Sequence, residues 1–85
     1  MRGADIPEQV SALLAEISAF EGLSLRGKTQ SAIYRKSKPF LHFHWHEDGI
    51  AADVRYADDW ERVPVNTAAQ RRQLVADVRA FLSAS

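Results

Sequence analysis

A strictly alternating segment, Leu41-His42-Phe43-His44-Trp45-His46, constrains the fold of this chain more than any other feature. Alternation of bulky apolar and polar residues is typical of a β-strand with one buried face. Successive side chains of a strand point to opposite faces, so Leu41, Phe43 and Trp45 are predicted to face a core. Every histidine of the chain lies in this segment. The pattern therefore predicts that all the imidazole rings share the other sheet face.

A hairpin is predicted around this strand. The segment Phe40 to Glu47 would pair with Ile50 to Tyr56 through a turn at Asp48-Gly49, because Asp-Gly is a favoured two-residue hairpin loop. The register that follows from this turn sets polar residues opposite one another, His44 with Asp53 and His42 with Arg55.

Two helices are predicted, one before and one after the strands. Apolar residues recur at helical spacing from Asp5 to Phe20 and again from Thr67 to about Leu82. Each range begins with capping-box spacing, in which a short polar residue is followed three positions later by Glu or Gln. These signals place helices at both ends of the chain.

The order of these elements predicts an α+β fold in one domain spanning residues 1–85. We expect a two-layer sandwich: an N-terminal helix, an antiparallel sheet of about three strands, and a C-terminal helix. The third strand is predicted at Thr29 to Arg35, and short edge strands are candidates at Leu23 to Arg26 and Arg62 to Val65. Both helices would cover one sheet face and leave the histidine face uncovered.

Composition excludes several classes of protein. Eleven Lys and Arg residues balance eleven Asp and Glu residues, which counts against a nucleic-acid-binding protein. The absence of cysteine removes disulfides and Cys-based zinc sites, and it suits a reducing compartment. No stretch has the roughly 18 consecutive apolar residues of a membrane span, and the first residues do not resemble a signal peptide. We therefore expect a soluble, cytoplasmic protein without a membrane partner.

The histidine segment offers candidate metal ligands: His42, His44, His46 and, from the neighbouring strand, Asp53. Histidines two residues apart on a strand are about 6.7 Å apart, so two imidazoles can converge on one ion, whereas His42 and His46 stand about 13 Å apart. Asp53 would be a third ligand, or an acceptor that fixes the tautomer of His44. Nitrogen ligands favour zinc, copper, nickel or iron over magnesium or calcium, although no metal remains the default expectation.

The functional hypothesis is a binding or interaction module, without an assignable reaction, that uses the histidine face for a small-molecule ligand or a transition metal. Its candidate ligand-binding residues are His42, His44, His46, Asp53 and Arg55. One alternative is a structural homodimer that buries this face. Another is a small enzyme with His44 as general base, oriented by Asp53, and Arg55 steadying an anionic substrate. The plainest interpretation is a solvated sheet face.

Charge is segregated along the chain despite the zero total. Residues 26–38 contain five basic residues and no acid, whereas residues 47–61 contain six acids and one Arg. Solvated hairpin charge is the favoured role of the basic stretch. The alternatives are contact with phosphate or an acidic partner, or with the acidic stretch of a second copy. Trp60, Tyr56 and Arg62 follow the hairpin, and core packing is the favoured role of this aromatic and basic group.

Overall fold

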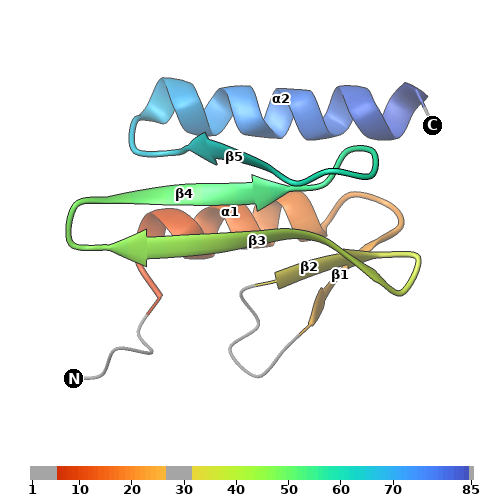
Figure 1. The fold of residues 1–85 in the computed structure, drawn as a ribbon, viewed down its shortest axis with the longest axis horizontal. Helices are drawn as coiled ribbons and strands as arrows, with labels where there is room; N and C mark the ends of the chain where they lie inside the picture. The colour runs from red at the N-terminus through yellow and green to blue at the C-terminus, as the bar shows by residue number, and fades with distance from the viewer. Residues whose placement is uncertain (1–5, 27–31, 85) are drawn as a thin grey trace.

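The computed structural model describes residues 6–26 and 32–84. It is an α+β fold in which two helices flank an antiparallel sheet (Figure 1). The elements are, in chain order, α1 (Glu8–Ser18), β1 (Leu23–Arg26), β2 (Ala32–Arg35), β3 (Lys38–His46), β4 (Gly49–Val54), β5 (Glu61–Pro64) and α2 (Ala68–Ala84). Each strand pairs with the next along the chain, which makes the sheet a meander.

The sheet has five strands, not about three. The two extra strands are the edges: β1 coincides with the candidate Leu23 to Arg26, and β5 overlaps the candidate Arg62 to Val65. Pro64 ends β5, as expected for a residue that cannot donate a ladder hydrogen bond and is tolerated at a sheet edge. Short edge strands carry weak alternation, which is why the sequence pattern left their number open. The Thr29 to Ser31 part of the third predicted strand lies outside the described residues.

Helix α1 begins at Glu8, directly after Pro7, and ends at Ser18, so it is shorter at both ends than predicted. Pro7 adopts an extended conformation (φ −57°, ψ 149°), and no side chain caps this end. The predicted cap, Asp5, lies outside the described residues. The predicted apolar stripe is confirmed, because the buried residues of α1 are Val10, Leu13, Leu14 and Ile17.

Helix α2 begins with the predicted capping box. The Gln70 backbone N–H donates to Thr67 Oγ1 at 3.1 Å, and Gln70 Oε1 accepts from the Thr67 backbone N–H at 3.1 Å. This reciprocal pair satisfies backbone groups that the first helical turn leaves without a partner. The Gln70 amide oxygen also accepts from the backbone of Asn66 at 2.8 Å, which ties the end of the sheet to the start of the helix.

The β3–β4 hairpin turns one residue earlier than the Asp48-Gly49 turn predicted, which shifts the β4 partner of each β3 residue by two positions. His46 pairs with Gly49, so the loop is Glu47-Asp48, and the predicted pairing of His44 with Asp53 is wrong. Gly49 instead serves a close contact: a β-carbon there would lie 3.0 Å from Asn66 Oδ1, which accepts a 2.7 Å hydrogen bond from the Ile50 backbone N–H. A shift of two residues leaves every side chain on its predicted face.

A β-bulge in β3 buries two consecutive residues. The pairing of β2 with β3 shifts between Ile33, which pairs with Leu41, and Tyr34, which pairs with Pro39, so Phe40 has no partner on β2. An extra residue of this kind bends the strand locally. As a result Phe40 and Leu41 are both buried, at 3% and 1% exposed.

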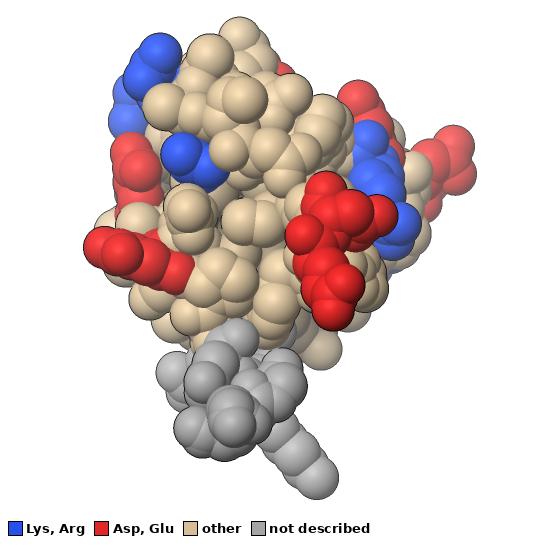
Figure 2. All heavy atoms as spheres, turned by 90° about the vertical axis from the view of Figure 1, so that its left-hand side faces the viewer, with Lys and Arg blue, Asp and Glu red and all other residues tan. Residues whose placement is uncertain are grey.

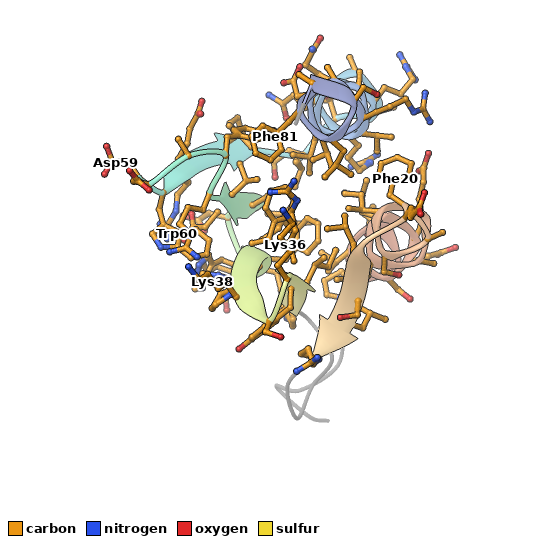
Figure 3. The ribbon with its side chains drawn as sticks, turned by 90° about the vertical axis from the view of Figure 1, so that its right-hand side faces the viewer. Phe20, Lys36, Lys38, Asp59, Trp60 and Phe81 are labelled. Atoms are coloured by element: carbon orange, nitrogen blue, oxygen red, sulfur yellow. The ribbon has the colours of Figure 1, made fainter. Side chains whose placement is uncertain are left out.

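One hydrophobic core lies between the sheet and the helices. Strand residues Leu41, Phe43, Ala52 and Val54 belong to the same buried cluster as the apolar stripes of α1 and α2, so both helices pack on one sheet face. Figure 3 shows the helices on one side of the sheet and Trp60 on the other. Within the described ranges, no helix has the length and apolar character needed to cross a membrane.

Candidate functional site

The face of the sheet opposite the helices carries the histidines, as the alternation predicted. Leu41 and Phe43 are buried, Trp45 packs partly against the core, and the side chains of His42 and His44 are 37% and 33% exposed. Neither described helix covers this face (Figure 3). The imidazoles are therefore half-buried by their neighbours on the sheet and open to solvent above it.

Asp53 lies between two of the histidines. Its Oδ2 is 2.8 Å from His44 Nε2 and 3.4 Å from His42 Nε2, and one ligand atom from each of the three residues lies within 4.8 Å of the others. The two imidazole rings contact edge to face, with centroids 4.6 Å apart. We call His42, His44 and Asp53 the His/Asp cluster. All three residues are among the predicted metal ligands.

Arg62 on β5 is the main neighbour that the sequence analysis did not place in this site. Asp53 pairs with Arg62 across the β4–β5 ladder, and the guanidinium donates to both carboxylate oxygens, Nε to Oδ1 at 2.8 Å and Nη2 to Oδ2 at 3.0 Å. Two parallel bonds of this kind are the strongest arrangement of an Arg–carboxylate pair. Arg62 thus holds Asp53 under the imidazoles, although its own side chain is 64% exposed.

The cluster fixes the charge of Asp53. The hydrogen bonds from Arg62, followed by those of His44, lower the pKa of the Asp53 carboxyl to about 2, against the opposing effect of partial burial. An ionised carboxylate can only accept hydrogen bonds, so the His44 Nε2 that lies 2.8 Å away carries a proton and donates it. For His42, burial and the nearby His44 lower the pKa below its usual value, which keeps that ring neutral at pH 7.

The lowered pKa of Asp53 predicts a loss of stability in acid. Its folded-state pKa of about 2 is below the unfolded value of about 3.9, so the stabilisation is complete above about pH 4 and is lost as the pH falls towards 2. We expect Asp53→Asn to reduce the free energy of unfolding by about 1 to 2 kcal/mol at neutral pH, because the ionised carboxylate and its hydrogen bonds are lost. The loss stays modest because solvent screens the exposed Arg62 partner. Urea unfolding at about pH 6 and about pH 2.5 should show this difference shrinking in acid.

Asp59→Asn is the matched control, because Asp59 is an exposed acid of the following loop. Its effect on stability should be small at both pH values. A difference between the wild type and Asp53→Asn that does not change with pH would contradict the assignment of the acid response to Asp53.

The remaining predicted residues lie outside the cluster. His46 is exposed at the end of β3, where it pairs with Gly49, and it does not approach Asp53. Arg55 is not opposite His42; its guanidinium lies 5.5 Å from the ring centroid of Trp60. Trp60 in turn contacts the His42 ring edge to face at 5.2 Å. The core role favoured for this aromatic group is confirmed for Tyr56, which packs against the core, and is wrong for Trp60, which is 43% exposed.

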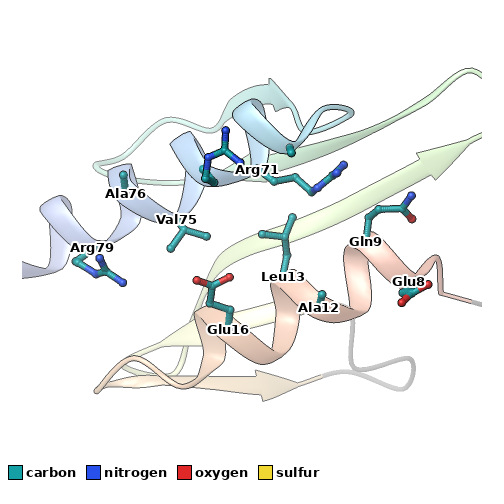
Figure 4. Close-up of a pocket in the computed structure, with 11 residues that line it drawn as sticks. Glu8, Gln9, Ala12, Leu13, Glu16, Arg71, Val75, Ala76 and Arg79 are labelled. Carbon is teal, nitrogen blue, oxygen red and sulfur yellow. The ribbon is translucent and has the colours of Figure 1, made fainter.

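A groove of about 600 Å³ lies between α1 and α2 (Figure 4). Both helices pack on the sheet face opposite the histidines, so the sheet separates this groove from the His/Asp cluster. Glu8 and Glu16 line it from α1, and Arg71 and Arg79 from α2. Arg71 already donates to the backbone carbonyls of Val65 and Asn66. Volume alone would favour this groove as the functional site. The imidazole and carboxylate groups that converge, however, lie on the sheet.

Charged side chains do not form a single-sign surface at the end of the molecule that carries the β3–β4 turn. Figure 2 shows acidic and basic side chains around uncharged surface there. A shallow hollow of about 280 Å³ lies at this end beside His44 and His46, with Arg62 and Asp48 on its walls. This end of the sheet therefore offers individual polar groups and not a broad electrostatic field.

Comparisons of the chain with protein-family models, with curated proteins and with solved structures find no match. The fold and the site therefore define the chain as a small α+β domain with an open sheet face. What distinguishes it within that description is the His/Asp cluster held by Arg62.

Proposed function

We propose that this protein is a binding module that holds one transition-metal ion, with zinc as the best-suited ion, at His42, His44 and Asp53. The observation that carries the proposal is the convergence of their ligand atoms within 4.8 Å on one sheet face. Two imidazoles and one carboxylate are ligands that zinc takes in proteins, and water would complete a tetrahedral set. This donor set disfavours magnesium and calcium, which prefer oxygen.

The spacing is compatible with coordination after small side-chain movements. Zinc bonds of about 2.0 to 2.1 Å at tetrahedral angles separate neighbouring ligand atoms by roughly 3.4 Å. His42 Nε2 and Asp53 Oδ2 are already 3.4 Å apart. His44 Nε2, at 2.8 Å from the same oxygen, would need to move away by about half an ångström to admit an ion.

The protonation states also suit a cation. Metal ligands must be deprotonated, and Asp53 is ionised above a pKa of about 2 while the lowered pKa of His42 keeps that ring neutral. His44 currently donates its Nε2 proton to Asp53, so binding through this nitrogen must move that proton to Nδ1 or to water. The bond between His44 and Asp53 is the contact that the ion replaces.

The direct test is a calorimetric titration of the protein with zinc chloride near pH 7, with histidine ring signals followed by NMR. We expect one ion per chain and shifts at His42 and His44, with His46 unaffected. A titration without saturable heat, or one in which His46 shifts as much as His44, would contradict the proposal.

Arg62 should compete with the ion for Asp53. Its guanidinium occupies both oxygens of the carboxylate, and its positive charge repels a cation. We expect Arg62→Gln to tighten zinc binding by about 3- to 10-fold, because the carboxylate is freed and a repelling positive charge is removed. The same calorimetric titration measures it.

Arg72→Gln on the exposed surface of α2 removes an equal charge away from the site, and it should leave zinc affinity unchanged. Weaker zinc binding in Arg62→Gln would mean that Arg62 supports the site more than it competes. The sheet-face homodimer and the general-base role of His44 stay predictions that rest on the same residues.

A further inference from the structure

A second site is suggested by charge at the opposite end of the strands. The β2–β3 turn and the β4–β5 loop lie at the same end of the sheet (Figure 1). Residues of both connections line a hollow of about 310 Å³. Its walls carry Arg35, Lys36, Lys38 and Arg55, with Asp58 as the one acid among the lining residues. We call this the basic hollow; Figure 3 views the molecule from this end, with Lys36 and Lys38 labelled.

Lys36, Lys38 and Arg55 place three like charges around one carboxylate, Asp58, in this hollow, and like charges repel one another unless an anion joins them. The two lysines come from the basic stretch of the sequence, and Arg55 comes from a segment that is otherwise acidic. Tyr56 also lines the hollow, and burial, with Asp77 and Glu61 nearby, raises the pKa of its phenol to about 12. Tyr56 therefore stays neutral and brings no negative charge to the hollow.

Aromatic rings hold both guanidinium groups in position. Arg35 lies over the ring of Phe81, 5.2 Å from its centroid, and Arg55 lies over Trp60 at 5.5 Å. A guanidinium stacked on a ring directs its N–H groups outward in the plane of the fork, the geometry that matches phosphate oxygens. Positioning before binding reduces the entropy lost when a ligand is taken up.

Backbone conformation at Lys36 points to the same role. Arg35 pairs with Lys38, and the two loop residues, Lys36 and Ser37, both have positive φ, at 56° and 67°. This is the type I′ arrangement, in which Asn-Gly is strongly preferred and long side chains are uncommon. A lysine retained in an unfavourable conformation is the kind of feature that marks a functional position.

We infer that the basic hollow binds a compact phosphate dianion, such as the phosphate or pyrophosphate group of a small molecule. The walls supply lysine point charges and stacked arginine forks, which make charge-assisted hydrogen bonds to phosphate oxygens. The volume of about 310 Å³ is at the lower end of small-molecule pockets. An extended polyanion fits less well, because Asp58 and Asp59 follow directly beside the hollow.

Titration with pyrophosphate, at low salt and with EDTA present to remove metal ions, tests the inference. We expect saturable one-to-one binding, with NMR shifts at the β2–β3 turn and at Arg55. Lys36→Asn removes a cation and also supplies a residue that type I′ turns prefer. This variant should bind pyrophosphate at least about 10-fold more weakly while its Tm rises by roughly 2 to 5 °C, which separates lost binding from lost folding.

Arg72→Gln is the matched control, since it removes a cation from exposed α2, and its pyrophosphate affinity should equal that of the wild type. The inference is overturned by absent saturable binding, or by equal weakening in Arg72→Gln and Lys36→Asn. It is also overturned if a single-stranded oligonucleotide binds more tightly than pyrophosphate at the same salt concentration. Because the His/Asp cluster shares none of these four cations, failure here would leave the zinc proposal standing.

Discussion

Substitution of His44 by alanine is expected to weaken zinc binding by about 100-fold or more. Mutation of a residue that hydrogen-bonds to a metal ligand already reduces metal affinity by about 10- to 100-fold, and His44 is itself a proposed ligand. Without it, His42 and Asp53 would be the only cluster residues left to hold the ion. Calorimetry on the purified variant near pH 7 measures this change directly.

His46→Ala provides the matched control on the same strand. His46 is exposed, lies two residues from His44 and is not among the residues whose ligand atoms converge. Its removal should change zinc affinity by less than about 2-fold. Equal losses in the two variants would show that zinc binds to the histidine segment without the geometry described above. Folding of both proteins should first be confirmed by circular dichroism.

Substitution of Phe40 by alanine is expected to lower the free energy of unfolding by about 3 to 4 kcal/mol. Phe40 is 3% exposed, stacks on Phe81 with ring centroids 5.9 Å apart and contacts Tyr56 edge to face at 6.3 Å. Its truncation would leave a cavity between the β-bulge and α2. For a domain whose total stability is on the order of 5 to 10 kcal/mol, this is a large fraction. Urea unfolding followed by tryptophan fluorescence gives the value.

Phe40→Leu separates the effect of lost buried volume on stability from the effect of the β-bulge itself. Leucine keeps most of the buried apolar surface, so we expect a loss of about 1 to 1.5 kcal/mol and an unchanged dependence on urea concentration. A loss below about 1 kcal/mol in Phe40→Ala would contradict the packing of this residue between the sheet and α2.

The faces of the sheet were predictable, whereas the register was not. Period-two alternation from Leu41 to His46 is a property of the strand itself. It therefore predicts that the histidines lie on the outer face of the sheet, whichever strand pairs with β3 and in whichever register. The pairing depends on the hairpin loop, and the Asp48-Gly49 signal was misleading because Gly49 is needed for the approach of Asn66, which is distant in sequence. Since the error was two residues, Asp53 still reached the histidines.

Arg62 shows what sequence patterns did not supply. Its contact with Asp53 requires β5 to pair with β4, and the connection after Val54 has no Asn-Gly or Asp-Gly dipeptide that would fix a register. Arg55, seven residues closer to the β3–β4 turn, was therefore the arginine that could be aligned with the cluster from spacing alone. The capping box of α2 was predictable, in contrast, because both of its residues lie within one helical turn.

The meander topology also bears on how the molecule reaches its native state. All groups of the cluster and the arginine that holds it come from three consecutive strands, β3 to β5, without a crossover between them. Short loops are closed at little entropic cost, and low contact order correlates with fast folding. We expect the ligand-bearing hairpins to assemble early, within milliseconds, and the terminal helix to dock on them in a later step that completes the core.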